Sequence, residues 1–151
     1  MPRLLIVHHT PSPATHDLLE AVRGGATDPA ITGVEVVVVP ALSAGASDVL
    51  GADGYLLGTP ANLGYMSGAL KHFFDVVYYP CLDATAGRPY GIWVHGNDDT
   101  TGARRGIERV VTGLGWKLAQ APLELTGPPG AADRDACREL GASLAAGLMV
   151  G

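Results

Sequence analysis

The sequence has few cysteines, few basic residues and no long hydrophobic run, and each shortage excludes a class of protein. Cys81 and Cys137 lie far apart and form no C-x-x-C or metal-binding spacing, so we expect free, reduced thiols. Lysine and arginine together number 10 and the net charge is −5, which argues against nucleic acid as a partner. No apolar run could span a bilayer and no leader pattern precedes the first predicted strand. We therefore expect a cytoplasmic protein without a membrane partner.

Several common catalytic and cofactor-binding motifs are also missing. Neither G-x-x-x-x-G-K nor G-x-G-x-x-G follows the first predicted strand, which disfavours a nucleoside triphosphate site and a Rossmann dinucleotide site. Residues 64–68 do not match G-x-S-x-G, the nucleophile motif of α/β hydrolases. The histidines have no H-x-x-x-H spacing and no glutamate partner, so we predict no metal site; those considered are His8, His9, His16 and His95.

What the sequence does contain is a regular alternation of apolar strands and helical patterns. Hydrophobic residues make up 47% and charged residues 17% of 151 residues, which predicts one domain over residues 1–151 with its own core. Alternation of this kind predicts an α/β fold, a parallel sheet with helices on both faces. The predicted strands are Leu4–His8, Val34–Pro40, Gly54–Thr59, Pro89–His95 and Trp116–Leu125. A central proline weakens the last strand and suits a sheet edge.

The predicted helices begin and end at recognisable signals. Ser12 is a good N-cap and Pro13 fits the first helical position, while Gly24-Gly25 is expected to end that helix. Ser67 is predicted to cap another helix, which Pro80 is expected to end. The remaining predicted helices are a short one around Ser47–Leu50, one from Ala103 to Leu114 and one over Ala131–Met149.

The junction after the first strand, residues 9–15, has the composition of an anion site. The first backbone N–H groups of a helix lack partners within the helix, and the helix dipole adds about half a positive charge there. Thr10, Ser12 and Thr15 supply hydroxyl groups that can turn toward one bound group, and we predict that this group is a phosphate. Many junctions of this composition bind nothing, so this loop alone leaves that alternative open.

Two other junctions, residues 60–66 and 96–101, are similarly polar or rich in glycine. In open parallel sheets, ligands bind beyond the carboxyl ends of the strands, at the point where the strand order reverses. With a strand order of 2-1-3-4-5, the junctions after strands one, three and four share that edge. The sequence therefore predicts one ligand site built from three separate loops.

A resemblance to a known family is carried mainly by residues 59–75, TPANLGYMSGALKHFFD. This segment resembles the S/T-P-x-x-x-G-x-M-S-G-x-L-K-x-F-x-D block of flavodoxin-like FMN proteins, in particular the NAD(P)H-dependent FMN reductase branch. Residues 6–15 resemble the flavodoxin phosphate loop, and the order of elements matches along essentially the whole chain. The resemblance implies a flavodoxin-like three-layer sandwich with a five-stranded parallel sheet of order 2-1-3-4-5, and FMN as cofactor.

The resemblance also assigns roles to the three loops. The first loop would hold the FMN phosphate through hydroxyl and N–H groups, the second would line one side of the isoalloxazine ring, and the third would line the other side. The residues concerned are Thr10, Ser12, Ala14 and Thr15 in the first loop, Pro60, Ala61, Asn62, Leu63 and Gly64 in the second, and Gly96, Asn97 and Asp98 in the third. Asp98 and Asp99 at the flavin edge would lower its reduction potential; the alternative is two solvated loop residues, one of them capping the next helix.

Departures from the family pattern decide between functions. Pro11 and Pro13 remove two N–H donors from the phosphate loop, and the loop of residues 96–100 contains no aromatic residue. One ring face would then be open to a nicotinamide or quinone, which favours a reductase with NAD(P)H as co-substrate and a small-molecule electron acceptor. Two alternatives remain: a one-electron carrier that serves a partner protein, and an FMN-free binding module. The sequence also leaves open whether the chain forms a homodimer. No catalytic residue is assigned, because the flavin itself would supply the chemistry.

Overall fold

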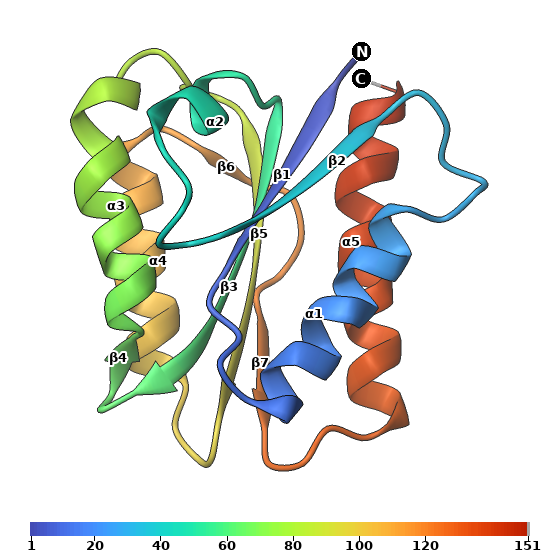
Figure 1. Ribbon diagram of the computed structural model, residues 1–151, viewed down its shortest axis with the longest axis vertical. Helices are drawn as coiled ribbons and strands as arrows, with labels where there is room; N and C mark the ends of the chain where they lie inside the picture. Colours follow the sequence, from blue (N-terminus) through green and yellow to red (C-terminus); the bar gives the residue numbers. More distant parts are fainter. Residues whose placement is uncertain (151) are drawn as a thin grey trace.

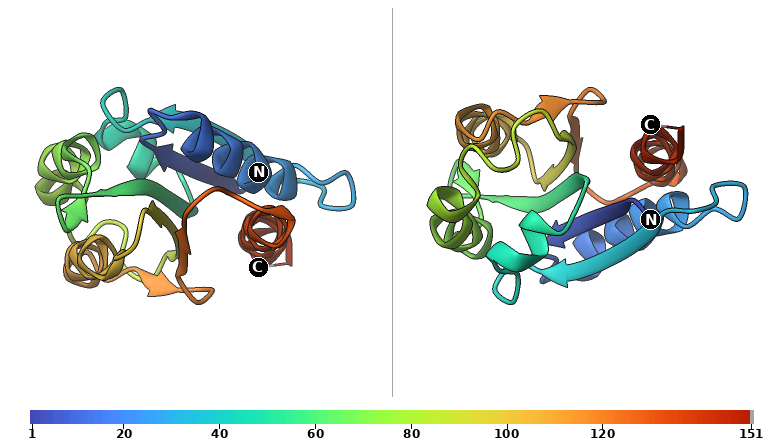
Figure 2. Two further views of the ribbon diagram at one scale, coloured as in Figure 1. Left: turned by 90° about the horizontal axis from the view of Figure 1, so that it is seen from below. Right: turned by 90° about the horizontal axis from the view of Figure 1, so that it is seen from above.

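The computed structural model describes residues 1–150, which fold into three layers with a parallel sheet in the middle. Helices α1 and α5 cover one face of the sheet, and α2, α3 and α4 lie on the other (Figures 1 and 2). The strands are β1 (Arg3–His8), β2 (Glu35–Pro40), β3 (Gly54–Asn62), β4 (Tyr65–Met66), β5 (Pro89–Gly96), β6 (Lys117–Leu118) and β7 (Leu123–Thr126). The helices are α1 (Pro13–Ala26), α2 (Ala46–Leu50), α3 (Gly68–Cys81), α4 (Thr101–Gly113) and α5 (Ala131–Val150).

The strand order confirms the predicted topology, with one correction. Strands follow the order β2-β1-β3-β5-β6, and β7 also pairs with β5 in parallel. The predicted fifth strand, Trp116–Leu125, was wrong as a continuous element. Two parts of it pair with β5 as β6 and β7, but residues 119–122 between them belong to no strand. Pro122 lies at the end of this break, and proline has no N–H to donate to a ladder.

Alternation along the strands divides the core between the two faces of the sheet. Leu5 and Val7 of β1 are buried against the α3 and α4 side, whereas Leu4 and Ile6 are buried against α1 and α5. Trp93 of β5 is 2% exposed and lies directly over β3. The ring fits there only because position 58 is glycine: a Cβ at Gly58 would lie 2.0 Å from Cζ2 of Trp93.

Both cysteines are free, as predicted, and both are buried. Cys137 lies in α5, and burial raises the pKa of its thiol to about 12. Cys81 was predicted to follow a helix, but it is the last residue of α3. Pro80 therefore does not end α3; it occupies the last turn, one residue before the end. Because proline has no N–H to donate to the carbonyl four residues earlier, the last turn of α3 lacks one hydrogen bond, and the helix ends one residue after Pro80.

The prediction that Gly24-Gly25 ends the first helix was also wrong, since α1 continues to Ala26. Gly25 instead allows α1 to approach α5 closely. A Cβ at Gly25 would lie 1.9 Å from the carbonyl oxygen of Arg138 in α5, and one at Gly141 would lie 2.0 Å from the carbonyl oxygen of Val22 in α1. Glycine at these positions removes the side chains that would separate the two helix backbones.

This close approach predicts that alanine substitution has opposite effects on stability at two adjacent glycines of α1. Gly25→Ala should destabilise the fold by about 1–3 kcal/mol, because the new methyl group overlaps backbone atoms of α5. Gly24→Ala is the matched control: its Cβ would meet nothing within 4 Å, and alanine should stabilise the helix by about 0.5–1 kcal/mol. Urea unfolding midpoints of the two variants measure the difference; equal midpoints would contradict the packing role of Gly25.

Candidate functional site

The C-terminal edge of the sheet carries a hairpin that the sequence did not predict. Residues 60–62 were expected to lie in a loop, but they extend β3, and Ala61 and Asn62 pair with β4. The two-residue turn between the strands consists of Leu63 with φ 50° and Gly64 with φ 79°. Positive φ at both central positions is the geometry of a type I′ turn, whose twist matches that of the strands it joins.

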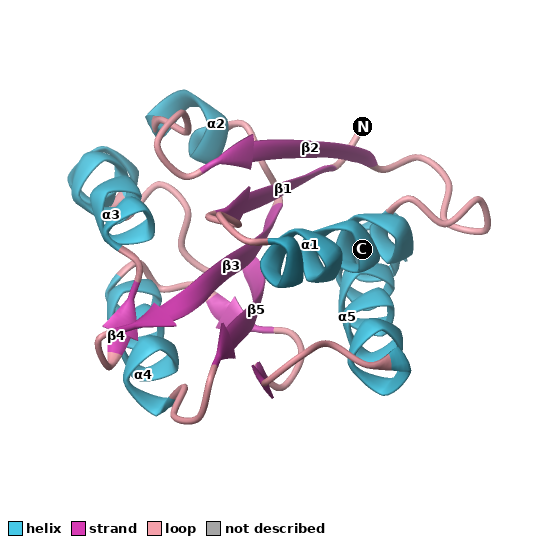
Figure 3. Ribbon diagram, turned by 60° about the horizontal axis from the view of Figure 1, so that its bottom comes forward, coloured by secondary structure: helices cyan, strands magenta, loops and turns pink. Residues whose placement is uncertain are grey.

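Two glycines of α4 hold this hairpin in place. A Cβ at Gly102 would lie 1.8 Å from the carbonyl oxygen of Gly64, and a Cβ at Gly106 would lie 2.4 Å from the ring of Tyr65. The hairpin therefore rests directly on the backbone of α4. Leu63 at its tip is fully exposed, and Figure 3 shows the β3–β4 hairpin beside α4 at the end of β3.

The three predicted junctions meet at this edge around one cavity. The cavity has a volume of about 240 Å³ and is lined from the β1–α1 loop, the end of β3 and the end of β5. Its lining residues are Pro11, Ser12, Thr15, Pro60, Ala61, Asn62, His95, Gly96 and Asn97. The structure thus brings together predicted site residues from all three loops.

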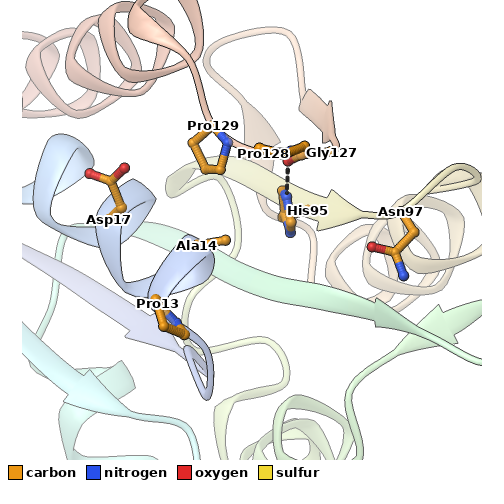
Figure 4. Close-up of a pocket in the computed structure, with 8 residues that line it drawn as sticks. All are labelled: Pro13, Ala14, Asp17, His95, Asn97, Gly127, Pro128 and Pro129. Atoms are coloured by element: carbon orange, nitrogen blue, oxygen red, sulfur yellow. Dashed lines mark hydrogen bonds between the residues drawn. The ribbon is translucent and has the colours of Figure 1, made fainter.

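Other predicted site residues do not line this cavity. Ala14 lines a neighbouring cavity of about 470 Å³, which shares His95 and Asn97 with the first (Figure 4). The hydroxyl of Thr10 lies 3.0 Å from Nδ1 of His8. Leu63 and Gly64 form the exposed hairpin turn, and the Asp98 carboxylate accepts a hydrogen bond of 2.6 Å from the N–H of Asp99.

The β1–α1 loop caps α1 with its own hydroxyl groups. Ser12 Oγ accepts a hydrogen bond of 3.2 Å from the N–H of Thr15, and Thr15 Oγ1 accepts one of 3.0 Å from the N–H of Ser12. This reciprocal pair is a capping box, and it confirms Ser12 as the N-cap and Pro13 as the first residue of the helix. Because both hydroxyls serve the helix, only part of their hydrogen-bonding capacity faces the cavity.

Two backbone donors of this loop remain without partners. Within residues 1–150, no hydrogen bond is formed by the N–H of Thr10 or the N–H of Ala14. Pro11 and Pro13 supply no N–H at all. The helix N-terminus therefore offers an anion fewer backbone donors than a loop without proline would.

His95 lies at the candidate site, which sequence reasoning did not predict because it considered this residue only as a metal ligand. It lines both cavities, and its Nε2 lies 2.7 Å from the carbonyl oxygen of Gly127 (Figure 4). Its position as the last side chain of the predicted fourth strand, at the ligand-binding edge, was the available signal. No cluster of three or more metal-ligating side chains occurs in the described part of the chain.

The charged groups around the site are mostly engaged with one another. Asp17 pairs with Arg134 of α5 at 3.1 Å, and Arg104 pairs with Glu124 at 3.1 Å. Hydrogen bonds donated by Thr101 lower the pKa of the Asp99 carboxyl, and Oδ1 of Asp99 accepts one of 3.0 Å from the N–H of Thr101, the first residue of α4. Burial, with the nearby His9 and His16, lowers the pKa of His8.

Comparison with known proteins defines the class of fold. No family model matches the sequence. A flavodoxin of Aquifex aeolicus (strain VF5) is 36% identical over 77 residues, which is 51% of this chain and 40% of that protein, so the match spans less than half of the relative's length.

Solved structures cover almost the whole chain. A flavodoxin of Streptococcus pneumoniae TIGR4 superposes with a TM-score of 0.81 at 21% identity, covering 96% of this chain and 99% of that one. A flavodoxin, WrbA-like protein of Agrobacterium tumefaciens gives 0.77 at 17% identity, covering 96% of each chain. The chain therefore has the flavodoxin-like fold that the resemblance implied. Among residues 1–150, no helix is both long and apolar enough to cross a membrane.

The contact between the β3–β4 hairpin and α4 predicts that a larger side chain at Gly102 would displace the hairpin. Gly102→Ala should destabilise the protein by about 1–3 kcal/mol and displace the hairpin, since the new methyl group overlaps the carbonyl of Gly64. Gly68→Ala is the control, because a Cβ there meets nothing within 4 Å. Limited proteolysis should cleave Gly102→Ala faster than the control in the segment of residues 61–66. Identical cleavage rates would show that α4 does not restrain the hairpin.

Proposed function

We propose that this chain binds FMN at the edge where the three loops meet and transfers electrons or hydride through it. The observation that carries the proposal is the 240 Å³ cavity, which joins the N-terminus of α1 to the ends of β3 and β5. An anion is stabilised at such a helix end by unpaired N–H groups and the helix dipole. Supporting arguments are the flavodoxin-like fold and the partial match to a flavodoxin.

The residues present fit the phosphate end of FMN. The unpartnered N–H groups of Thr10 and Ala14 are the backbone donors that this loop offers, and the Ser12 hydroxyl, which lies 2.9 Å from Thr15 Oγ1, could turn its hydrogen toward a phosphate instead. Typical small-molecule pockets have volumes of about 300–1,000 Å³, so a cavity of 240 Å³ suits the phosphoryl and ribityl part of the ligand. The ring system would then lie at the rim, against the strand segment of residues 60–62 and beside Asn97.

When bound, FMN would supply the redox chemistry, and the chain would bind it, orient it and shield one side of it. The hairpin would give the ring a wall supported from behind, because it packs directly against the backbone of α4 at Gly102 and Gly106. The opposite loop, residues 97–99, is exposed and contains no aromatic residue. A nicotinamide or quinone ring could stack on the face left open there, which favours a reductase over a one-electron carrier.

Flavin binding is the first experiment. Purified protein, stripped of any bound ligand, is titrated with FMN and separately with riboflavin, which lacks the phosphate; quenching of flavin fluorescence reports binding. We expect FMN to bind more tightly than riboflavin, because the phosphate site contributes only to FMN. A protein that leaves FMN fluorescence unchanged would overturn the proposal and favour the FMN-free binding module.

The reductase and carrier alternatives differ in their response to nicotinamide nucleotides. The FMN-loaded protein should oxidise NADH or NADPH in the presence of a quinone, at a rate that saturates with nucleotide concentration. Protein without FMN is the matched control. If neither nucleotide is consumed, while dithionite-reduced protein passes electrons to a protein acceptor such as a cytochrome, the carrier is the correct function.

Removing the two hydroxyls of the first loop should weaken FMN binding. The double variant Ser12→Ala/Thr15→Ala should lose about 2–3 kcal/mol of FMN binding free energy, because hydrogen bonds to a charged group are lost. It should also lose roughly 1 kcal/mol of stability with the capping box. Thr27→Ala, which alters the far end of α1, is the control and should bind FMN normally. Unchanged FMN affinity in the double variant would remove the phosphate assignment.

A further inference from the structure

We infer that His95 binds the phosphoryl group of FMN as a protonated donor and so replaces the backbone donors that Pro11 and Pro13 remove. This inference rests on the proposed function, and it adds a residue to the phosphate site that lies far from the β1–α1 loop in sequence. Its observable consequence is an advantage in FMN binding, relative to a variant without the imidazole, that grows as the pH falls and is absent for riboflavin.

The position of His95 follows from the register of the sheet. His95 stands beside Pro60 of β3 on one side and beside Leu125 of β7 on the other. It is therefore at the same edge as the N-terminus of α1. Its side chain lines the 240 Å³ cavity together with Ser12 and Thr15, the two residues that cap that helix.

The hydrogen bond to Gly127 fixes the role of each ring nitrogen. A carbonyl oxygen can only accept, so the Nε2 that lies 2.7 Å from Gly127 must carry a hydrogen. In Figure 4 the ring stands between Ala14 and Asn97, with Nδ1 on the side away from Gly127. No hydrogen bond to Nδ1 of His95 is formed by any residue from 1 to 150.

The free Nδ1 gives the two protonation states opposite effects on a phosphate. In the neutral ring Nδ1 is an acceptor, and its lone pair would repel a phosphate oxygen. In the protonated ring Nδ1 becomes a second donor and carries positive charge, and such charge-assisted hydrogen bonds are roughly twice as strong as neutral ones. A phosphate therefore favours the protonated ring, and the added proton comes from solvent. Histidine is the side chain that gains this charge between about pH 5 and pH 8.

No other side chain lining the two cavities can supply this charge. Neither lysine nor arginine contributes to the described lining of either cavity. Around His95, α1 presents Asp17, whose charge is offset by Arg134 of α5 at 3.1 Å. The charged or titratable groups on the other neighbouring elements are His9 of the β1–α1 loop, Glu124 of β7, which is bound to Arg104, and Asp98 and Asp99 of the β5–α4 loop.

The test compares FMN with riboflavin in wild-type protein and in His95→Gln. A glutamine amide can still donate to the carbonyl of Gly127, but it cannot become charged. At about pH 6, we expect His95→Gln to bind FMN about tenfold or more weakly than wild type and to bind riboflavin equally well. His72→Gln, an exposed position in α3, is the matched control and should behave as wild type.

The pH dependence separates a charge from a structural contact. Wild-type affinity for FMN, relative to that of His95→Gln, should fall as the pH rises from about 6 to about 8. The comparison with the variant cancels the titration of the FMN phosphate itself, whose second pKa is near 6. His95→Asn places an uncharged amide donor near the position of Nδ1, so it should regain part of the affinity without the pH dependence.

Three outcomes overturn the inference. The first is that His95→Gln binds FMN with the same affinity and the same pH dependence as wild type. The second is that His95→Gln loses affinity for FMN and for riboflavin equally, which would mean that His95 does not act on the phosphate. A phosphorus NMR signal of bound FMN that is unchanged between wild type and His95→Asn would be the third. Each of these requires that wild-type protein binds FMN. If it does not, the proposed function fails first and takes this inference with it.

Discussion

Parallel strands bring their carboxyl ends to one edge of the sheet, and this constraint decides where the chain can bind a ligand. Residues 9–15, 60–62 and 95–97 are far apart in sequence, yet each follows or ends a strand of the same parallel set. The order β2-β1-β3-β5 places the junctions after β1 and β3 on opposite sides of a reversal in strand order, where a crevice opens. The location of the candidate site is therefore set by the strand order, and the side chains determine only what the site can bind.

The topology and the site edge could be predicted because both depend on local signals. Apolar runs define the strands, and Ser12 with Pro13 and Ser67 define two helix starts that the structure reproduces. Those signals act over a few residues, so they are present in the sequence itself. The twofold alternation of β1 between the two core faces is of the same kind.

What sequence reasoning missed depends on contacts between distant residues. Gly25 resembles a helix terminator in sequence, but its role is set by Arg138, which is more than a hundred residues away. The β3–β4 hairpin has no strong turn sequence at Leu63, and it is held by Gly102 and Gly106 of α4. His95 likewise acquires its orientation from Gly127 in a loop that follows another strand. None of these partners can be identified without the fold.

The contact of α1 with α5 has a consequence for how the site can move. The backbones meet where Gly25 and Gly141 leave no side chain between them, so neither helix can slide or rotate without driving carbonyl groups into its neighbour. The two helices are therefore expected to shift together, and the Asp17–Arg134 ion pair joins the early part of α1 to α5 as well. Adjustment of this edge to an incoming molecule therefore falls more easily to the β5–α4 and β7–α5 turns, which line the cavities without being part of the helix pair.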